Sequence, residues 1–173
     1  MRWIAGAVAA LAIAAAVAAA QIGTPETPLN SLLGTAKVPA QHPAAVRYLY
    51  PEQVSLPAGK PVTVALHFRV APGLHINSHT PRGEFLIPTT VAIPDGAGVR
   101  LAGADYPPGT EYRPPEDRKT RLRVYAGEFV IRARLVAEAG DHLVELRLRY
   151  QACAYNTCMP PRTILAAIDV IGK

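Results

Sequence analysis

The two cysteines are the residues of this chain with the clearest capacity for chemistry. Cys153 and Cys158 are its only cysteines, and four residues lie between them. In the chain-entropy account, a disulfide that closes so short a loop stabilises a fold by about 2 kcal/mol, against about 5 kcal/mol for a loop of a hundred residues. The short loop suits thiol–disulfide exchange, because the second thiol stays close enough to resolve a mixed disulfide. Spacing alone leaves a permanent structural disulfide and a redox pair equally open.

Other chemistries fit these residues less well. A closed zinc site needs about four ligands, and no further Cys or His lies near the pair in sequence, so no metal site is predicted. His75 and His79 would lie about 13 Å apart on an extended chain, too far to share one ion. Copper(I) bound by the two thiols and Met159 is a weaker alternative. A Cys–His hydrolase would need a histidine beside a thiolate, which nothing in the sequence indicates.

The first 45 residues predict export rather than a folded domain. Met1-Arg2 is a short positive head, and residues 3–20 are apolar, uncharged and end in three alanines, a small-residue cleavage pattern. We expect a cleaved signal peptide over residues 1–20, a periplasmic or otherwise exported protein, and no membrane insertion of the mature domain. A retained anchor is the alternative. Residues 21–45 contain four prolines and little periodicity, which predicts a linker or arm.

Residues 46–173 have the length of one typical domain with its own core. Loss of Arg2 with the signal leaves 17 of the 18 basic residues against 13 acidic ones, a formal charge of +4. Basic and acidic residues are interleaved, and no basic block with interspersed aromatic residues is present, so no nucleic-acid partner is expected. The oligomeric state is not predicted by any of these features.

Alternation of apolar and polar residues predicts strands through most of this domain. The strand-like runs are 46–50, 61–70, 74–78, 85–93, 99–102, 121–125, 128–137, 141–150 and 163–171. Ala126-Gly127 predicts a hairpin between two of them, and the prolines and charges of 106–119 predict a long surface loop. Short strands without an amphipathic helix predict an all-β fold, an immunoglobulin-like antiparallel β-sandwich. The cysteines would lie at the end of strand 141–150 and in the turn after it.

The segment around the cysteines resembles a known family. Tyr150-Gln151-Ala152-Cys153 and, after four residues, Cys158-Met159-Pro160-Pro161 are similar to the active-site segment of the amino-terminal periplasmic domain of DsbD, the membrane thiol:disulfide reductase. Gly73-Leu74-His75-Ile76-Asn77-Ser78 and Pro88-Thr89 resemble a further stretch of that family. The resemblance extends over about residues 45–171.

The resemblance implies a sandwich in which Cys153 and Cys158 alternate between dithiol and disulfide without a cofactor. It implies six supporting residues: Tyr150, Gln151, Pro160, His75, Asn77 and Tyr112. In the family, electrons reach the domain from a thioredoxin-like domain of the same protein and pass to other periplasmic proteins. This sequence contains no such domain, so thioredoxin-like or DsbD-type redox proteins would act on it in trans, with the chain as a protein-disulfide reductase or relay component. The alternative is a non-catalytic binding module with a structural Cys153–Cys158 disulfide.

The family pattern carries two finer expectations and two departures. It implies that Cys153 bonds to the partner and that Cys158 is attacked less easily. It also implies a capping loop within residues 106–119, with an aromatic side chain that shields the disulfide. Tyr106 and Tyr112 are the aromatic residues there, and no matching Phe motif is present. The four-residue spacing between the cysteines is one shorter than in the best-known members.

Overall fold

The computed structural model of the protein describes residues 44–50, 53–155 and 157–173. Contacts divide the chain into residues 1–41 and 42–173, and every described residue belongs to the second unit. The predicted signal peptide and almost all of the predicted arm lie outside the described residues. The last arm residue, Ala45, is only 5% exposed and packs in the core. Within the described ranges, no helix has the length and apolar character needed to cross a membrane.

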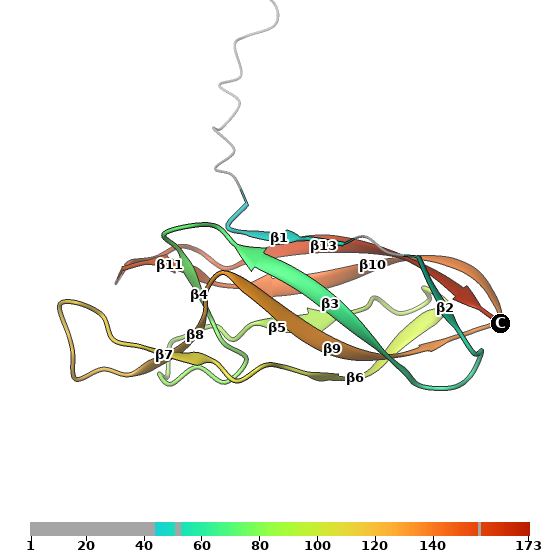
Figure 1. Ribbon diagram of the computed structural model, residues 1–173, viewed down its shortest axis with the longest axis horizontal. Helices are drawn as coiled ribbons and strands as arrows, with labels where there is room; N and C mark the ends of the chain where they lie inside the picture. Colours follow the sequence, from blue (N-terminus) through green and yellow to red (C-terminus); the bar gives the residue numbers. More distant parts are fainter. Residues whose placement is uncertain (1–43, 51–52, 156) are drawn as a thin grey trace, which may run out of the picture. The chain divides into compact units, whose positions relative to one another are not determined.

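Three sheets make up the domain (Figure 1). The first has the order β1-β3-β9-β6, formed by β1 (Val46–Tyr48), β3 (Val62–Val70), β9 (Glu128–Ala137) and β6 (Val99–Asp105). The second has the order β2-β13-β10-β5, formed by β2 (Gln53–Leu56), β13 (Arg162–Gly172), β10 (Gly140–Tyr150) and β5 (Thr90–Ala92). The third has the order β12-β11-β4-β8-β7, formed by β12 (Thr157–Cys158), β11 (Ala152–Ala154), β4 (His75–Asn77), β8 (Leu122–Tyr125) and β7 (Thr110–Tyr112).

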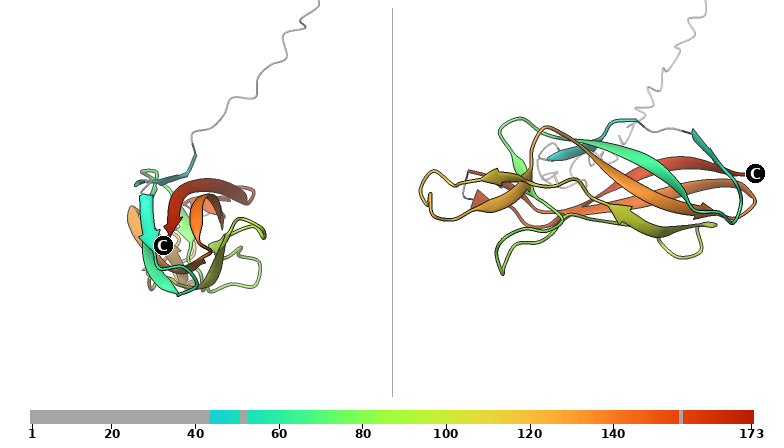
Figure 2. Two further views of the ribbon diagram at one scale, coloured as in Figure 1. Left: turned by 90° about the vertical axis from the view of Figure 1, so that its right-hand side faces the viewer. Right: turned by 60° about the horizontal axis from the view of Figure 1, so that its bottom comes forward.

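The two four-stranded sheets lie face to face as a β-sandwich, which confirms the predicted fold class (Figure 2). Their inner faces carry the apolar residues that alternate along the strands, including Leu66, Phe68, Ile131, Leu135, Val144, Leu146 and Leu148, each fully buried. Burial of each such side chain contributes about 1.5–3 kcal/mol relative to exposure. The sandwich is not wholly antiparallel, because β2 pairs with β13 in parallel.

The third sheet lies at one end of the sandwich (Figure 1), and the two shortest of the connections between them are Gln151 and Ala126-Gly127. Gln151 lies between β10 and β11. Ala126-Gly127 lies between β8 and β9, where Gly127 has a φ of 62°, a left-handed conformation that glycine adopts without steric cost. The predicted hairpin across Ala126-Gly127 is wrong, because β8 pairs with β4 and β7, whereas β9 pairs with β3 and β6. The turn passes the chain from one sheet to another instead of folding it back on itself.

Two other segments differ from the predicted strands and loops. In the run 85–93, only Thr90–Ala92 is a strand, since Pro88 lacks the N–H that a ladder requires. The predicted surface loop 106–119 contains β7, which pairs with β8. Strands β2, β11 and β12 were not predicted, because segments of two to four residues are too short to show a period.

Candidate functional site

The two cysteines lie opposite each other in a small hairpin of the third sheet. Cys153 of β11 pairs with Cys158 of β12, their Cα atoms are 4.0 Å apart, and a disulfide joins them. Tyr155 in the intervening turn has a φ of 52°, a left-handed conformation that is uncommon for a residue with a side chain. The cysteines were expected at the end of strand 141–150 and in the turn after it. They lie instead in a separate hairpin, whose strand β11 also pairs with β4.

The register of this sheet brings four predicted site residues to one face. Cys153 pairs with His75 of β4, and residues paired across antiparallel strands project to the same face. Asn77 lies two residues beyond His75, and Gln151 lies two residues before Cys153, so the period of two places both on that face as well. Segments about 75 residues apart in sequence therefore meet around the disulfide.

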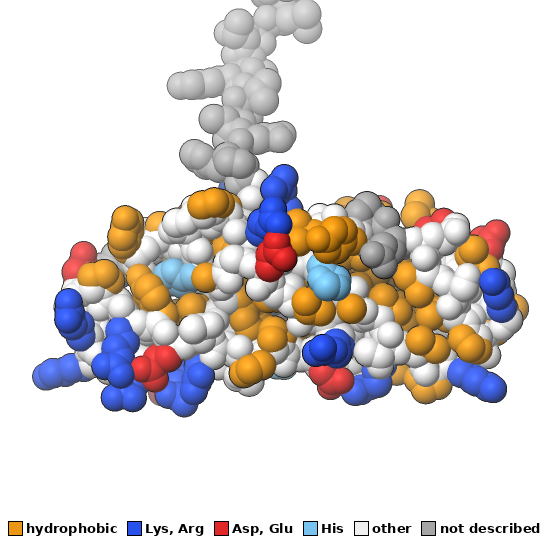
Figure 3. All heavy atoms as spheres, viewed as in Figure 1, with side chains coloured by type: hydrophobic (Ala, Val, Ile, Leu, Met, Phe, Trp, Pro, Cys, Tyr) orange, Lys and Arg blue, Asp and Glu red, His pale blue; other side chains and the backbone are white. Residues whose placement is uncertain are grey.

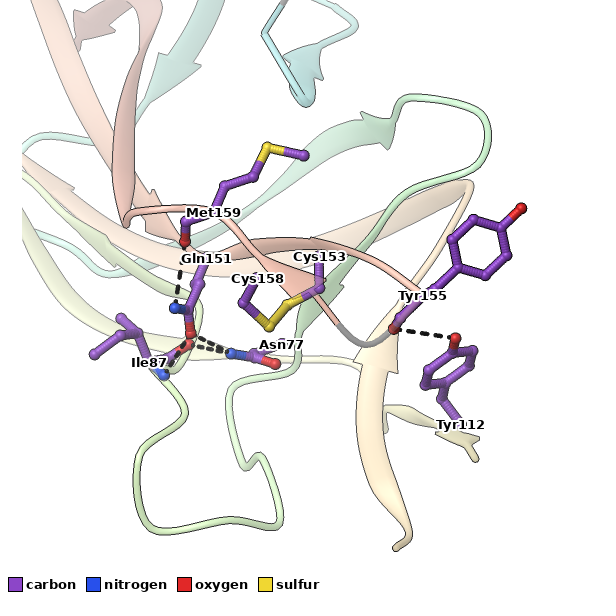
Figure 4. Close-up of a disulfide and its surroundings, with 8 residues drawn as sticks. All are labelled: Asn77, Ile87, Tyr112, Gln151, Cys153, Tyr155, Cys158 and Met159. Carbon is purple, nitrogen blue, oxygen red and sulfur yellow. Dashed lines mark hydrogen bonds between the residues drawn. A yellow bond between two sulfur atoms is a disulfide. The ribbon is translucent and has the colours of Figure 1, made fainter. Parts of the chain in front are cut away.

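Hydrogen bonds fix the polar side chains beside the disulfide (Figure 4). Asn77 Nδ2 donates to Ile87 O at 3.1 Å and to Gln151 Oε1 at 3.0 Å. Gln151 Oε1 also accepts from Ile87 N at 3.2 Å, and Gln151 Nε2 donates to Met159 O at 3.3 Å. Met159 N in turn donates to the Ala152 carbonyl at 2.8 Å. The network ties both ends of the cysteine hairpin to β4 and to the loop that contains Ile87.

The two cysteines differ sharply in exposure. Cys153 is only 2% exposed, whereas Cys158 is in the exposed class. Attack on a disulfide requires access to one sulfur. The residue exposures favour attack at Cys158, whereas the resemblance implies that Cys153 bonds to the partner.

Tyr112 is the aromatic residue of the 106–119 segment that contacts the site. Its ring centroid lies 4.3 Å from that of His75, and its hydroxyl donates to the Tyr155 carbonyl at 3.2 Å. Tyr112 thus spans from β7 to the turn of the cysteine hairpin (Figure 4). His75 is only 6% exposed, and this burial lowers the pKa of its imidazole. A neutral His75 ring therefore lies between Tyr112 and the strand that carries Cys153.

Tyr106, the other aromatic residue of that segment, lies elsewhere. It stacks on His79 with ring centroids 3.7 Å apart, and its hydroxyl accepts from Val91 N at 2.9 Å. These contacts fix the start of the segment to the second sheet and to the residues after β4.

Tyr150 and Pro160 border the site without reaching the disulfide. Tyr150 is fully buried at the end of β10, and burial raises the pKa of its phenol. Both residues line an apolar groove of about 520 Å³ together with Ala45, Leu74, Ala152, Met159 and Arg162. The Met159 side chain points away from the two sulfurs in Figure 4. No group of three or more His, Cys, Asp or Glu that could hold a metal occurs among the described residues.

The loop between β7 and β8 is basic. Residues 113–121 contain Arg113, Arg118, Lys119 and Arg121 against two acidic residues. Glu111 of β7 pairs with Arg113 at 2.9 Å and with Arg121 at 3.7 Å, and its bond to Arg113 lowers the pKa of the carboxyl group. Figure 3 shows Lys and Arg side chains gathered at the end of the domain where this hairpin lies.

A disulfide that joins a buried cysteine to an exposed one meets the requirement of thiol–disulfide exchange, which needs access to one of the two sulfurs. The sequence matches the family described as "Thiol:disulfide interchange protein DsbD, N-terminal" over residues 45–169. The chain belongs to this family, which confirms the resemblance seen in the sequence. No curated protein matches the chain.

Solved structures of two related domains are similar to this one. The reduced N-terminal domain of DsbD from Neisseria meningitidis aligns with a TM-score of 0.45 and 21% identity, over 66% of this chain and 82% of that one. The N-terminal periplasmic domain of ScsB from Proteus mirabilis aligns with a TM-score of 0.48 and 14% identity, over 65% of this chain and 42% of that one. The chain therefore spans less than half of the ScsB structure.

Sequence reasoning missed the role of Ile87, whose backbone N–H and C=O both enter the network around Gln151 and Asn77. Thr89 was noted only as part of a motif; its hydroxyl donates to the Asn77 carbonyl at 2.5 Å. The Pro88-Thr89 pair was the one sequence signal that pointed to this segment. Hydrogen bonds made by backbone groups cannot be predicted from the pattern of side-chain types along the sequence.

Proposed function

We propose that this domain transfers electron pairs between periplasmic redox proteins through the Cys153–Cys158 disulfide. The observation that carries the proposal is the asymmetry of the pair, in which an exposed Cys158 is bonded to a buried Cys153 within a five-residue separation. Family membership supports the reaction type. The residues present require no cofactor for it, because thiol–disulfide exchange needs only thiolates and disulfides.

Reduction of the domain would proceed in two exchanges. A partner thiolate attacks Cys158 Sγ, the S–S bond breaks, and Cys153 leaves with the electron pair and takes up a proton. The second partner thiol then loses its proton and attacks the partner's sulfur in the mixed disulfide, which releases Cys158 as a thiolate that is protonated in turn. The partner ends as a disulfide, and the domain gains two electrons and two protons. In the reverse direction, Cys158 attacks an oxidised acceptor and Cys153 resolves the mixed disulfide.

The surrounding residues would hold the pair in place for this chemistry. Gln151 anchors the cysteine hairpin at both ends, and Tyr112 restrains its turn. His75 is the nearest titratable side chain by register to Cys153, and its neutral form avoids a permanent positive charge beside the buried sulfur. Pro160 and Tyr150 would belong to the groove next to the site rather than to the chemistry.

The partners that fit this site are thioredoxin-like or DsbD-type proteins acting in trans. Tyr155 in the turn of the cysteine hairpin is 72% accessible and offers an apolar contact on the same hairpin as Cys158. We infer export to the periplasm, with residues 1–20 as a cleaved signal peptide, from the sequence pattern of the first 20 residues. Membership in the family of DsbD N-terminal domains, which the sequence resemblance associates with the periplasm, supports this location.

The proposal is tested by trapping and by equilibration. Cys153→Ser leaves Cys158 as the free thiol and should form a mixed disulfide with a thioredoxin-like protein that lacks its resolving cysteine, whereas Cys158→Ser should give much less adduct. Absence of adducts from both variants would refute the exchange function. In a glutathione or thioredoxin buffer series, the wild-type bond should titrate between about −120 and −270 mV. A bond that stays oxidised below about −300 mV would instead support a binding module with a structural disulfide.

A further inference from the structure

The Asn77 side chain contains a buried oxygen without a partner. Asn77 is fully buried, and its Oδ1 has no hydrogen-bond donor among the described residues. Buried polar atoms in native proteins nearly always have a partner, so each exception calls for an explanation. A lone buried acceptor lowers the stability of the fold. The presence of this oxygen is explained if it accepts a hydrogen bond in another state of the protein.

The orientation of this amide is fixed by its neighbours. Both protons of Asn77 Nδ2 are used, since this nitrogen donates to Ile87 O and to Gln151 Oε1. A flipped amide would set Oδ1 against the Ile87 carbonyl, which cannot donate. Gln151 cannot flip to compensate, because its Oε1 accepts from the Ile87 N–H and its Nε2 donates to a carbonyl. Backbone groups therefore define which side of the amide is oxygen.

The free oxygen belongs to a side chain on the same face of the sheet as the redox pair. Asn77 is the diagonal neighbour of Cys153 across β4 and β11, on the same face of the sheet, and diagonal neighbours lie within about 7–8 Å. In Figure 4, the amide nitrogen of Asn77 is directed to Gln151, and the oxygen lies on the other side of the amide. A disulfide has no proton to donate, so the oxidised state leaves this acceptor unpaired.

Reduction creates the missing donor. We propose that Asn77 Oδ1 accepts a hydrogen bond from the Cys153 thiol in the reduced protein, so that Asn77 acts as a positioning residue that favours the dithiol. The reaction adds two electrons and two protons from an external dithiol, and one of these protons becomes the S–H of Cys153. Because Cys153 is buried, its thiol has little access to water and needs an acceptor within the protein. The exposed Cys158 thiol can donate to solvent instead.

This inference deepens the proposed function, but its test does not require a protein partner. Asn77→Leu removes the acceptor at similar volume, and the redox equilibrium is measured against dithiothreitol. We expect the ratio of dithiol to disulfide at a given dithiothreitol poise to fall about three- to tenfold, the range for a weak hydrogen bond. Ser78→Ala is the matched control. Ser78 is the next residue, is fully buried and also has an unpaired hydroxyl oxygen, but strand alternation directs it to the opposite face. It should leave the equilibrium unchanged.

A spectroscopic measurement keeps the proposal falsifiable if Asn77→Leu does not fold. In Cys158→Ala, the Cys153 thiol is the only one, and its infrared S–H stretch should lie at lower frequency in the folded protein than in the same chain unfolded in urea. Adding Ser78→Ala should leave that band where it is. An unshifted S–H band, an unchanged redox equilibrium in folded Asn77→Leu, or an equal effect of Ser78→Ala would overturn the proposal. If these results hold while no partner is trapped, the exchange function fails and the hydrogen bond stands.

Discussion

Reduction of the disulfide in the folded domain should cost little stability. The bond joins residues separated by five positions, so the chain-entropy expression gives an entropy loss of about 7 cal/mol/K in the unfolded chain, or about 2 kcal/mol at 25 °C. A hydrogen bond from the Cys153 thiol to Asn77 would return up to about 1 kcal/mol to the reduced form. We therefore expect the oxidised domain to be more stable than the reduced one by only about 1–2 kcal/mol.

Urea unfolding of the oxidised and reduced wild-type domain, the latter in excess phosphine reductant, measures this difference without a substitution. The two curves should have the same slope, because both forms bury the same sandwich. By the thermodynamic cycle, the potential of the bond in the folded domain should lie about 20–40 mV below its value in the urea-unfolded chain. A stability loss above about 4 kcal/mol, or a changed slope on reduction, would show that the bond holds the fold together and would refute the argument for a bond that is made and broken.

Three further predictions concern residues around the disulfide. Gln151→Ala removes three hydrogen bonds from partly buried groups and should lower the free energy of unfolding by about 2–4 kcal/mol. The control Gln53→Ala removes one exposed hydrogen bond and should lower it by under about 0.5 kcal/mol. Equal losses in denaturant titrations would contradict the role given to the network. Tyr112→Ala should speed reduction by dithiothreitol about fivefold, since it frees the hairpin turn, and Tyr112→Phe, which retains the ring contact, should speed it less. Identical rates for the three proteins would show that Tyr112 does not restrain the site. Because burial lowers the pKa of His75 below 6.5, the unfolded chain binds more protons below that pH, and the domain should lose stability as pH falls from about 6.5 through the lowered pKa. His75→Gln should flatten that part of the stability–pH curve, and an unchanged curve would assign the pH dependence to other groups.

The long strands of the sandwich were predictable because their apolar residues alternate over seven or more positions. The runs 61–70, 128–137 and 141–150 each bury one face as expected. What the pattern could not give is pairing. Whether Ala126-Gly127 closes a hairpin or passes the chain to another sheet depends on which distant strand offers the better apolar surface for pairing. In this fold β9 pairs with β3 along one edge and with β6 along the other.

The candidate site was predictable in its residues and not in its geometry. The cysteine motif identified Cys153, Gln151 and, through the upstream stretch, His75 and Asn77, and the register places these four on one face. Their exposures were not predictable, because burial of Cys153 depends on a sheet assembled from segments far apart in the chain. For the same reason the expected order of attack was opposite to the one that the exposure of Cys158 favours.

The sequence distances within the cysteine hairpin have a consequence for biogenesis. Cys153 reaches Cys158 across five positions but reaches its strand partner His75 across 78, the difference between 153 and 75. Closing the short loop costs little chain entropy, so an oxidant can form the bond while the rest of the chain is still unfolded. With only two cysteines, no wrong pairing within the chain exists. If the chain is exported as proposed, a newly translocated molecule would need a source or a sink of electrons to set its redox state, but no isomerase to correct its disulfide.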